Sequence, residues 1–355
     1  MAVLYLDFLY PIGHKQFNSS IINAISSIMD IYVLCPRGYY NNFTQLKNNP
    51  HVHFIDDLSI NHEFDEFNAG RVARYIRTIR IMHYSAKIKK QLPITKIIIA
   101  SYNTVLLLIW QFGVKHNCPE FIMHHDNIDA LENKLRCVCF SLYANLVNHI
   151  ALEEFIANYL INKFKINPAK ITVLPQEAQK INIGSYIAET PVYYCVGLSC
   201  SNDEKFIKNI LKLQEKEHVF KQKNMLLLKS SIYEYNDGCL RIIKGYIPTL
   251  EYQYLLVNAK VICLPFSLSY KYRSSGVLSD AFANNKPVIG SNFELLKYFS
   301  KRMPTCCTIF YNTLNFIELV QSNLSVNAHD FDDYIKNHSK NKIQEILMTM
   351  LRSKS

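Results

Sequence analysis

The sequence contains no apolar run of the 18 to 20 residues, roughly, that a helix needs to cross a membrane. Its longest candidate, residues 97–112, is interrupted by Ser101, Asn103 and Gln111. The opening residues, MAVLYLDFLYP, lack the basic region of a secretory signal and include Asp7, so we expect a first strand there. These features favour a globular protein of the cytoplasm.

The signatures of a metal site, a redox site and a dinucleotide site are also missing. The ten cysteines include Cys137-x-Cys139 and the adjacent Cys306-Cys307, but none has C-x-x-C spacing, so we expect reduced core thiols. The loop after the expected first strand contains only Gly13, whereas the dinucleotide fingerprint needs three glycines. This argues against a nicotinamide-dependent dehydrogenase.

The charge balance is strongly basic. Lys and Arg total 39 against 29 Asp and Glu, which gives a formal net charge of +10. A basic surface suits nucleic acid, anionic lipid or phosphate-bearing small molecules. Because the sequence has no helix-turn-helix, zinc-finger or aromatic RNA-binding signature, we expect no nucleic-acid partner. Phosphorylated small molecules and an anionic membrane surface remain as the favoured partners.

Strand and helix patterns alternate along the whole chain, which predicts doubly wound parallel sheets. A length of 355 residues exceeds one comfortable core, so we expect two domains joined by the polar stretch that begins at Pro175. The strands of the first half are expected at residues 2–9, 31–35, 51–55, 96–100, 120–124, 149–152 and 171–174. Those of the second half are expected at residues 192–197, 225–228, 240–243, 261–264, 288–289 and 308–311, before one terminal helix at residues 330–351.

The most informative window is residues 260–291. A buried strand leads into a polar loop that contains Lys271 and Arg273, and Ser274-Ser275-Gly276 then opens a helix that carries Asp280. A strand, a loop with Ser and Gly and a helix N-terminus together form an anion site the size of a phosphate. A carboxylate one turn later can accept hydrogen bonds from ribose hydroxyls. The window therefore indicates half of a nucleotide-sugar site, although any α/β protein contains units of this topology.

The string DAFA at residues 280–283, followed by KPVI at residues 286–289, resembles the donor-binding segment of family 4 (group 1) glycosyltransferases. The resemblance implies the GT-B fold, in which two Rossmann-like domains face a central cleft and a C-terminal helix crosses back onto the first domain. It implies domains at residues 1–178 (acceptor side), 186–328 (nucleotide-sugar side) and 329–355 (returning helix). Two departures stand out: Tyr272 replaces a Glu common in the family, and the ribose acid Asp280 is one methylene shorter than Glu.

The activity that the resemblance implies is hexosyl transfer from a nucleotide-diphosphate sugar to a hydroxyl of a glycan or lipid-linked glycan, with retention. We expect no metal or other cofactor, because helix N-termini and cations can hold the diphosphate and because Asp332-Asp333 is not an Asp-x-Asp motif. Two alternatives stay open: a nucleotide-sugar epimerase of the same fold, and a non-catalytic protein that binds a sugar nucleotide.

Other candidate donor contacts surround this window in sequence. Lys229 follows an apolar strand, and the turn from Gly245 to Ile247 resembles the family's contact with the nucleotide base. In the first half, Gly13 and His14 lie in the loop that such enzymes turn toward the donor diphosphate. The complete set of expected donor-binding residues is Gly13, His14, Lys229, Gly245, Ile247, Lys271, Arg273, Ser274, Ser275, Gly276 and Asp280.

His124-His125-Asp126 closes the expected strand at residues 120–124. In an open α/β sheet the carboxyl ends of the strands line the ligand crevice, so these three residues are the catalytic candidates. The resemblance adds that a His in this region contacts the donor sugar or works near the reaction centre, without saying which of the two His it is. Adjacent side chains on a strand point to opposite faces, which argues against a metal shared by both His.

A long basic helix is expected at residues 71–91. It carries Arg71, Arg74, Arg77, Arg80, Lys87, Lys89 and Lys90, with an apolar strip between them. A basic amphipathic helix can lie on an anionic membrane, which would place the protein peripherally on the inner face. The alternative is an ordinary solvated helix whose apolar strip packs on the sheet.

Overall fold

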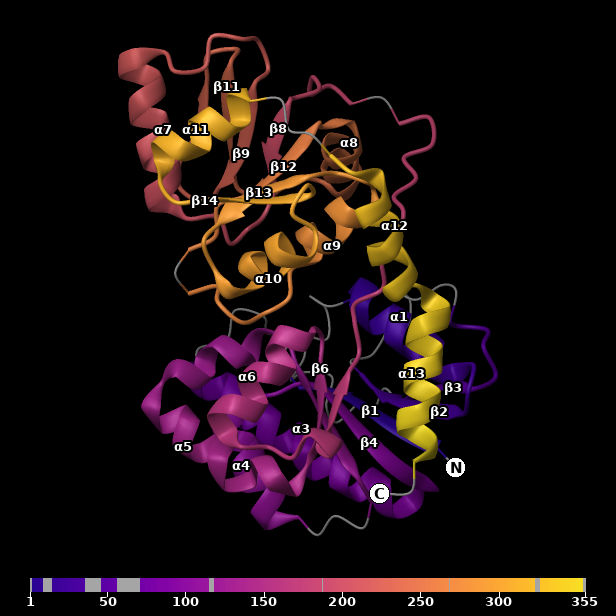
Figure 1. Cartoon of the computed structure of the whole chain (residues 1–355). Coiled ribbons are helices and arrows are strands. Elements are labelled where there is room, and N and C mark those ends of the chain that lie inside the picture. Colours follow the sequence, from indigo (N-terminus) through magenta and orange to yellow (C-terminus); the bar gives the residue numbers. More distant parts are fainter. Residues whose placement is uncertain are drawn as a thin grey trace. The chain divides into compact units, whose positions relative to one another are not determined.

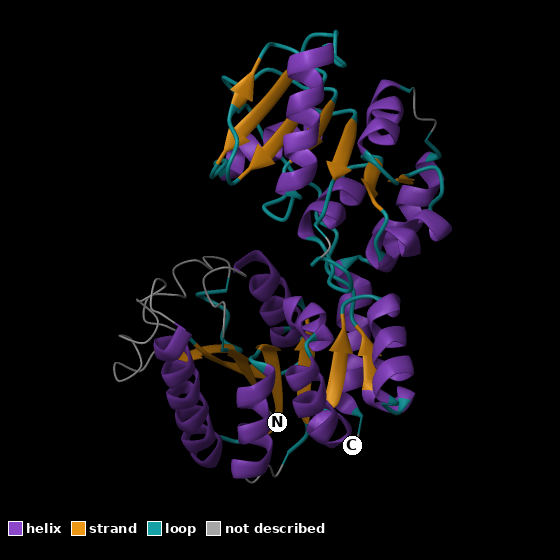
Figure 2. Cartoon of the chain, turned by 90° about the vertical axis from the view of Figure 1, so that its left-hand side faces the viewer, coloured by secondary structure: helices purple, strands orange, loops and turns teal. Residues whose placement is uncertain are grey.

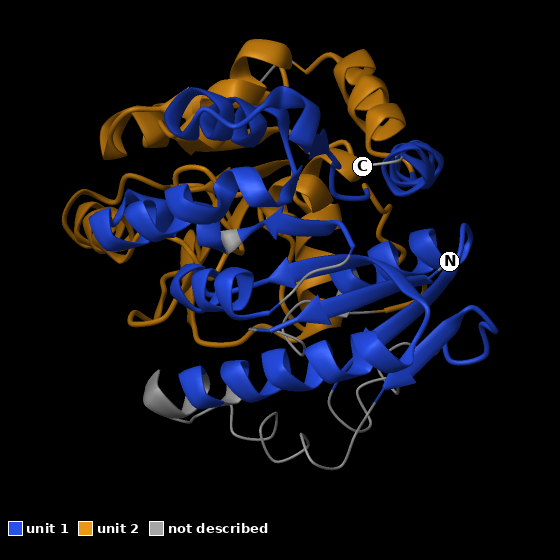
Figure 3. Cartoon of the chain, turned by 90° about the horizontal axis from the view of Figure 1, so that it is seen from below, with its two compact units in different colours: residues 1–177, 340–355 blue, residues 178–339 orange. Residues whose placement is uncertain are grey.

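The computed structural model describes residues 2–8, 15–35, 46–55, 71–114, 118–186, 188–267, 269–322 and 326–353. The chain forms two compact units (Figure 3): Met1–Glu177 with Lys340–Ser355 make unit 1, and Ala178–Ser339 make unit 2. Each unit is a parallel sheet with helices on both sides (Figure 2). None of the described helices is both long and apolar enough to pass through a bilayer.

Among the described residues, unit 1 builds a seven-stranded sheet in the order β3-β2-β1-β4-β5-β6-β7 (Figure 1). Every neighbouring pair in it is parallel, and the seven expected strands are confirmed. Their bounds are β1 (Ala2–Asp7), β2 (Asp30–Leu34), β3 (Val52–Ile55), β4 (Ile94–Ser101), β5 (Glu120–His124), β6 (Asn148–Ala151) and β7 (Ile171–Val173).

The strand order of unit 1 reverses between β1 and β4. Because crossovers are right-handed, the helices that follow β1 and β4 cover opposite faces of the sheet. α1 packs against α13 on one side, and on the other α3 packs against α4 and α4 against α5. The helices are α1 (Lys15–Ser26), α3 (Arg71–Gln91), α4 (Thr104–Gly113), η2 (Asp126–Glu132), α5 (Lys134–Tyr143), η3 (Ala144–Leu146), α6 (Glu154–Phe164), η4 (Pro168–Lys170) and α13 (Lys340–Arg352).

The described part of unit 2 holds a second seven-stranded sheet, in the order β10-β11-β9-β8-β12-β13-β14. Its pairs are parallel except for the short hairpin of β10 and β11, and the six expected strands are confirmed. The strands are β8 (Cys195–Gly197), β9 (Leu226–Ser230), β10 (Tyr235–Asn236), β11 (Leu240–Lys244), β12 (Val261–Leu264), β13 (Val288–Ser291) and β14 (Cys307–Phe310). The helices are α7 (Glu204–Glu217), α8 (Thr249–Asn258), α9 (Gly276–Ala283), α10 (Glu294–Arg302), α11 (Thr313–Gln321) and α12 (Ala328–Asn337).

The single terminal helix expected at residues 330–351 is wrong, since two helices, α12 and α13, occupy this stretch. The break falls at His338 and Ser339. The His338 ring stacks on Tyr334 at 3.7 Å between centroids and shares a hydrogen bond of 2.8 Å with the Tyr334 carbonyl. The Ser339 hydroxyl donates to the Lys336 carbonyl. The Tyr334 carbonyl keeps its helical bond from the His338 amide, but the Lys336 carbonyl accepts from both the amide and the hydroxyl of Ser339 instead of from residue 340, so α12 ends there.

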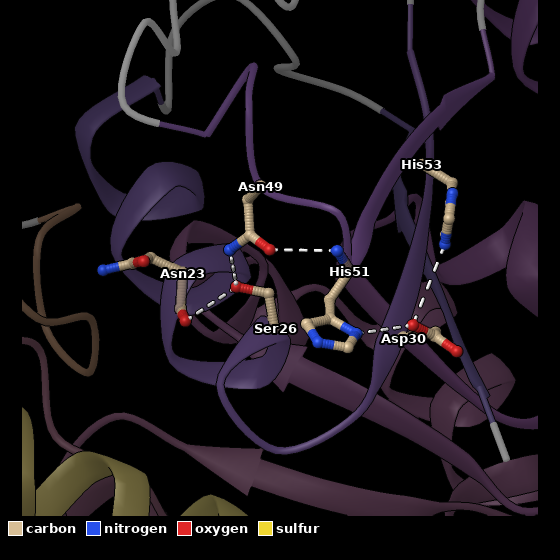
Figure 4. A network of polar contacts seen from close by, with 6 residues as sticks. All are labelled: Asn23, Ser26, Asp30, Asn49, His51 and His53. Atoms are coloured by element: carbon tan, nitrogen blue, oxygen red, sulfur yellow. Dashed lines mark hydrogen bonds and ion pairs between the residues drawn. The ribbon is translucent and has the colours of Figure 1, made fainter.

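A polar network ties the turn after α1 to the start of β3 (Figure 4). The Asn49 amide donates to Ser26 Oγ at 2.9 Å and accepts from the His51 backbone amide at 2.9 Å. His51 Nδ1 lies 2.8 Å from an Asp30 oxygen, and this hydrogen bond lowers the pKa of Asp30. The network sits at the amino ends of β2 and β3, away from the carboxyl ends where ligands of α/β proteins bind, and it orders the sheet edge.

Candidate functional site

The N-terminus of α9 has the features that helices use to bind anions. Ser275 caps the helix, because its extended backbone lets the side-chain oxygen accept from the Leu278 amide at 3.3 Å. The remaining amides of the first turn have no partner inside the helix. Ser274 is buried, and its hydroxyl has no hydrogen-bond partner among the described residues. The expected residues Ser274, Ser275 and Gly276 thus stand together where a phosphate would bind.

An aromatic stack orders the loop before α9. The rings of Phe266 and Tyr270 stack at 4.0 Å between centroids, and the Arg273 guanidinium lies 4.5 Å from the Tyr270 ring centre. The Tyr270 hydroxyl donates to the Ser274 carbonyl at 2.5 Å. The stack therefore holds the Arg273 cation next to the helix start, with half-buried Lys271 in the same loop. Sequence reasoning missed Tyr270, although an aromatic pair four residues apart before the Ser-Ser-Gly string was a usable signal.

Asp280 is half-buried and is tied to the neighbouring helix. Its Oδ2 accepts a hydrogen bond of 2.7 Å from the Tyr252 hydroxyl of α8. Burial raises the pKa of the Asp280 carboxyl, and the bond from Tyr252 opposes this rise. Burial, followed by the charge of Asp280, raises the pKa of Tyr252 well above 10. The pair leaves Oδ1 of Asp280 as the acceptor that a ligand hydroxyl would use.

The turn before α8 contains the expected contacts Gly245 and Ile247. Gly245 adopts a φ of +90°, which a side chain would strain. The Ile247 side chain is buried, so this residue anchors the turn to the unit. Since α8 also supplies Tyr252, the turn and Asp280 belong to one connected part of unit 2. Tyr252 was not predicted, because it is separated from its partner Asp280 by 28 positions in the sequence.

The loop after β8 contributes a buried amide. The Asn202 side chain donates to the carbonyls of Gly197 and Lys229 at 2.9 and 3.0 Å, while its own Oδ1 has no partner within the described residues. A Cβ on Gly197 would lie 2.7 Å from a Leu228 methyl, so glycine is required for β8 to pack. Lys229, an expected donor contact, is half-buried in β9 and meets Asn202 through its carbonyl. Asn202 was not predicted.

His124 and His125 of the expected catalytic group differ in their exposure to solvent. His124 is fully buried, and its Nε2 lies 2.9 Å from His149 Nδ1. Burial and the neighbouring His149 hold the pKa of His124 well below 6.5, and burial lowers the pKa of His149 to about 4. Both rings are therefore neutral at physiological pH. The structure gives His124 no surface through which to touch a ligand, so its role here is in the core.

His125 is the better placed of the two. It is half-buried, its ring contacts that of Phe17 at 5.7 Å, and its backbone amide donates to Asn127 Oδ1 at 3.0 Å. The Asn127 side chain is buried and its Nδ2 has no partner in the described part of the chain. The side chain of Asp126 lies outside what the structure describes, as do the expected residues Gly13 and His14.

A buried carboxylate marks the reversal of strand order in unit 1. Asp7 ends β1, and its oxygens accept from the Asn18 amide at 2.9 Å and from the Ser101 hydroxyl. The Tyr5 hydroxyl donates to Asn18 at 2.7 Å. A carboxylate at such a switch point lies where ligands of open α/β sheets bind. Sequence reasoning used Asp7 only against a signal peptide and missed this position.

No group of three or more His, Cys, Asp or Glu side chains in the described ranges is arranged to hold a metal ion.

Known proteins resemble this chain in structure but not detectably in sequence. No family model matches the sequence, and neither does any curated protein. Solved structures do match: a glycosyltransferase from Rickettsia africae superposes with a TM-score of 0.65 at 12% identity and 99% coverage of both chains. The lipopolysaccharide outer core galactosyltransferase WaaB gives 0.62 at 11%, and Anabaena HepE, solved with UDP and glucose, gives 0.64 at 10%, each again with 99% of both chains covered.

Agreement over nearly the whole chain confirms the expected α/β architecture and shows the GT-B fold, which these glycosyltransferases share. At such low identity the likeness extends to the fold alone. The residues of the site, and not the superposition, must therefore carry any argument about chemistry.

Proposed function

We propose that this chain is a glycosyltransferase of the family 4 type, which binds a nucleoside diphosphate sugar in unit 2 and transfers the sugar to a hydroxyl group. The observation that carries the proposal is the geometry at α9. A capped helix start with a buried, unpartnered Ser274 hydroxyl lies one turn from the carboxylate of Asp280. One place thus offers donors for phosphate and an acceptor for a sugar hydroxyl.

In this proposal the first turn of α9 holds the diphosphate. The amide groups and the hydroxyls of Ser274 and Ser275 donate to its oxygens, as helix N-termini do for anions. Arg273, fixed on the Tyr270 ring, and Lys271 offset the charge that grows on the leaving diphosphate. Lys229 is the third cation assigned to this task. No metal is assigned to the site.

Asp280 accepts from a ribose hydroxyl through the oxygen that Tyr252 does not use, and the Gly245 to Ile247 turn contacts the base. Support for a uridine nucleotide comes from HepE, whose structure contains UDP. We assign the acceptor side to unit 1, where Asp7 ends β1 and His125 follows β5. Hexosyl transfer with retention to a glycan or lipid-linked glycan, in the cytoplasm, completes the proposal.

Titration calorimetry with UDP, GDP and UMP tests the donor site directly. One diphosphate should bind, and UMP should bind more weakly, because it lacks the second phosphate that α9 would hold. A screen of UDP- and GDP-sugars for hydrolysis then tests turnover. Failure of every nucleotide to bind would contradict the proposal.

One observation favours a second candidate, a non-catalytic protein that binds a sugar nucleotide. The position eight residues before Asp280 is Tyr272, where many family 4 members have Glu. Nucleotide binding without hydrolysis or transfer of any sugar would support this candidate over the enzyme.

A further inference from the structure

Unit 1 exposes a group of large apolar side chains on α4, on α5 and on η3, the short helix that follows α5. Each is between 57% and 67% exposed, and α4 packs directly against α5, the helix that is followed by η3. We call this group the α4–α5 apolar face; its members are Ile109, Phe112, Leu135, Val138, Leu142 and Leu146. On α5 the spacing of Leu135, Val138 and Leu142 puts all three on one side of the helix. Soluble proteins seldom leave so many large apolar side chains together in water.

The sequence of α4 reinforces the point. TVLLLIWQFG is apolar on nearly every side, and such a helix is ordinarily covered on all sides. Its inner side is covered, with Leu107 and Trp110 buried. Its outer side, with Ile109 and Phe112, faces solvent. A second surface is needed to bury the outer side.

The region is net positive, because the nine Lys and Arg in the sequences of α3 and α5 outnumber the three acids of η2, which packs against α5. The sequence of α3 contains seven Lys and Arg, that of α5 contains Lys134 and Arg136, and none of α3, α4 and α5 contains Asp or Glu. Exposed Glu132, just before α5, lies 2.7 Å from the ammonium of Lys163. The apolar residues therefore lie in a positive field, which selects an anionic partner.

A basic pocket opens beside the face, between the last turns of α3 and the end of α4. Its volume is about 810 Å³, and it is lined by His83, Lys87, Lys89, Lys90, Gly113 and Val114, among others. The Lys89 ammonium is buried beside the Cys118 thiol of the same pocket, and its charge opposes the rise that burial causes in the pKa of Cys118. Gly113 follows Phe112 directly, so the pocket and the apolar face adjoin. The pocket suits an anion the size of a phosphate headgroup.

We propose that the α4–α5 apolar face docks on an anionic lipid bilayer. The apolar side chains enter the interfacial layer while the lysines of α3 contact lipid phosphates, the arrangement of interfacial helices. A second copy of the chain is the weaker occupant, because it would place two basic faces against each other. A lipid surface can bury the apolar side chains and can also place its phosphates next to the lysines. This docking does not require that sugar transfer occurs.

The first test is sedimentation with vesicles of equimolar phosphatidylserine and phosphatidylcholine, at low salt, with pure phosphatidylcholine as the neutral arm. Wild type should bind the anionic vesicles, and added salt should weaken binding. Leu135→Gln with Leu142→Gln should weaken it by roughly tenfold for each leucine removed from the interface. Ile232→Gln with Leu314→Gln is the matched control, since these unit 2 side chains are 55% and 61% exposed, and it should bind as wild type does.

The only tryptophan of the chain gives a second readout. Trp110 lies buried in α4, directly behind the apolar face. Bromine-labelled lipid in the anionic vesicles should quench its fluorescence, because bromine quenches only at short range. Quenching should disappear in the Leu135→Gln, Leu142→Gln variant.

Three results would overturn the proposal. The first is that the wild-type protein fails to sediment with anionic vesicles at low salt. The second is that it binds the vesicles but the fluorescence of Trp110 is not quenched. The third is a wild-type oligomer that Leu135→Gln with Leu142→Gln converts to monomer, which would make the face a contact between copies. UDP calorimetry on the same variants keeps a failure of docking distinct from a failure of the donor site.

Discussion

Each unit has a hydrogen-bonded pair of titratable side chains among its expected site residues and their partners, and the two pairs can be compared. In unit 1, His124 and His149 meet at 2.9 Å, and both rings are sealed from solvent. In unit 2, Tyr252 and Asp280 meet at 2.7 Å, but Asp280 is only half-buried. The pairs are similar in geometry and differ in access. A ligand can reach the second pair and not the first.

Solvent access also influences the protonation state of each pair. Burial lowers the pKa values of both His, so their pair stays neutral and joins two strands. Burial raises the pKa of Asp280, yet the bond from Tyr252 favours its charged form. The difference teaches that a histidine at the end of a strand is not by itself a catalytic group, because the strand end can face inward.

The largest effect is expected from His124→Leu. The change leaves His149 Nδ1 and the Tyr102 hydroxyl without the ring that they contact. Losing a buried hydrogen-bond partner costs about 1 to 3 kcal/mol for each group left behind, so stability should fall by about 3 kcal/mol. Urea denaturation measures this loss.

His125→Leu is the matched control for that variant, since the half-exposed neighbour should change stability by less than about 1 kcal/mol. UDP affinity should be unaltered in both. If His124→Leu kept wild-type stability, the view of His124 as a core residue would fail.

The second effect concerns Asp280→Ala. The variant loses the acceptor for a ribose hydroxyl, which is worth on the order of 2 to 3 kcal/mol of nucleotide affinity. It also leaves the buried Tyr252 hydroxyl without its hydrogen-bond acceptor, so some stability should be lost as well. Calorimetry with the nucleotide and denaturation of the free protein measure the two losses separately.

A double-mutant cycle separates the roles of this pair. Tyr252→Phe alone, and Tyr252→Phe with Asp280→Ala, complete the cycle. Adding Tyr252→Phe should restore the stability that Asp280→Ala loses and leave the affinity low. Unchanged affinity in Asp280→Ala would remove this carboxylate from the donor site.

The third effect is a dependence on pH that has opposite signs for His149 and Asp280. An ordinary His has a pKa of 6.5, whereas His149 has about 4, so the unfolded chain takes up the proton first as pH falls. Stability is therefore lost from about pH 6.5 downward, at about 1.4 kcal/mol per pH unit, or about 2 kcal/mol by pH 5. His124 acts in the same direction.

Asp280 acts the other way, because its raised pKa makes the folded state take up the proton first. As pH falls, Asp280 thus adds stability to unit 2, whereas Glu204 and Asp237 of the same unit, whose pKa values are lowered by hydrogen bonds, lose it. Replacing both His124 and His149 with Leu should flatten the loss between pH 6.5 and 5 in denaturation curves. A slope that survives the double replacement would assign it to other groups.

Sequence reasoning predicted the strands of both sheets except the two-residue β10, because their apolar runs are separated by helical patterns. It also placed Ser274, Ser275 and Asp280 together, since helix caps and phosphate loops are local in sequence. It could not find Tyr252 or the His149 partner of His124, because such contacts join positions 25 or more residues apart. The break after α12 was missed for another reason: Ser339, and not Gly or Pro, takes the Lys336 carbonyl with its amide and its hydroxyl.

The smallest expected effect is on UDP affinity, and it is tested with two serines whose hydroxyls are in the same situation. The hydroxyls of Ser274 and Ser279 are both buried, and neither has a hydrogen-bond partner among the described residues. Removing a buried hydroxyl that makes no bond should cost nothing, or even stabilise the free protein by up to about 1 kcal/mol. Ser274→Ala and Ser279→Ala should therefore look alike in denaturation without nucleotide.

The two variants should separate once UDP is added. Ser274 precedes the helix cap and is assigned to the diphosphate, whereas Ser279 lies within α9, a full turn beyond the Ser275 cap. Ser274→Ala should weaken UDP binding by about 1 kcal/mol, the usual worth of one hydrogen bond, and Ser279→Ala should leave it unchanged. Equal affinity of both variants for UDP would mean that the Ser274 hydroxyl is a packing defect like that of Ser279. The anion site would then consist of the α9 amides and the Ser275 cap alone.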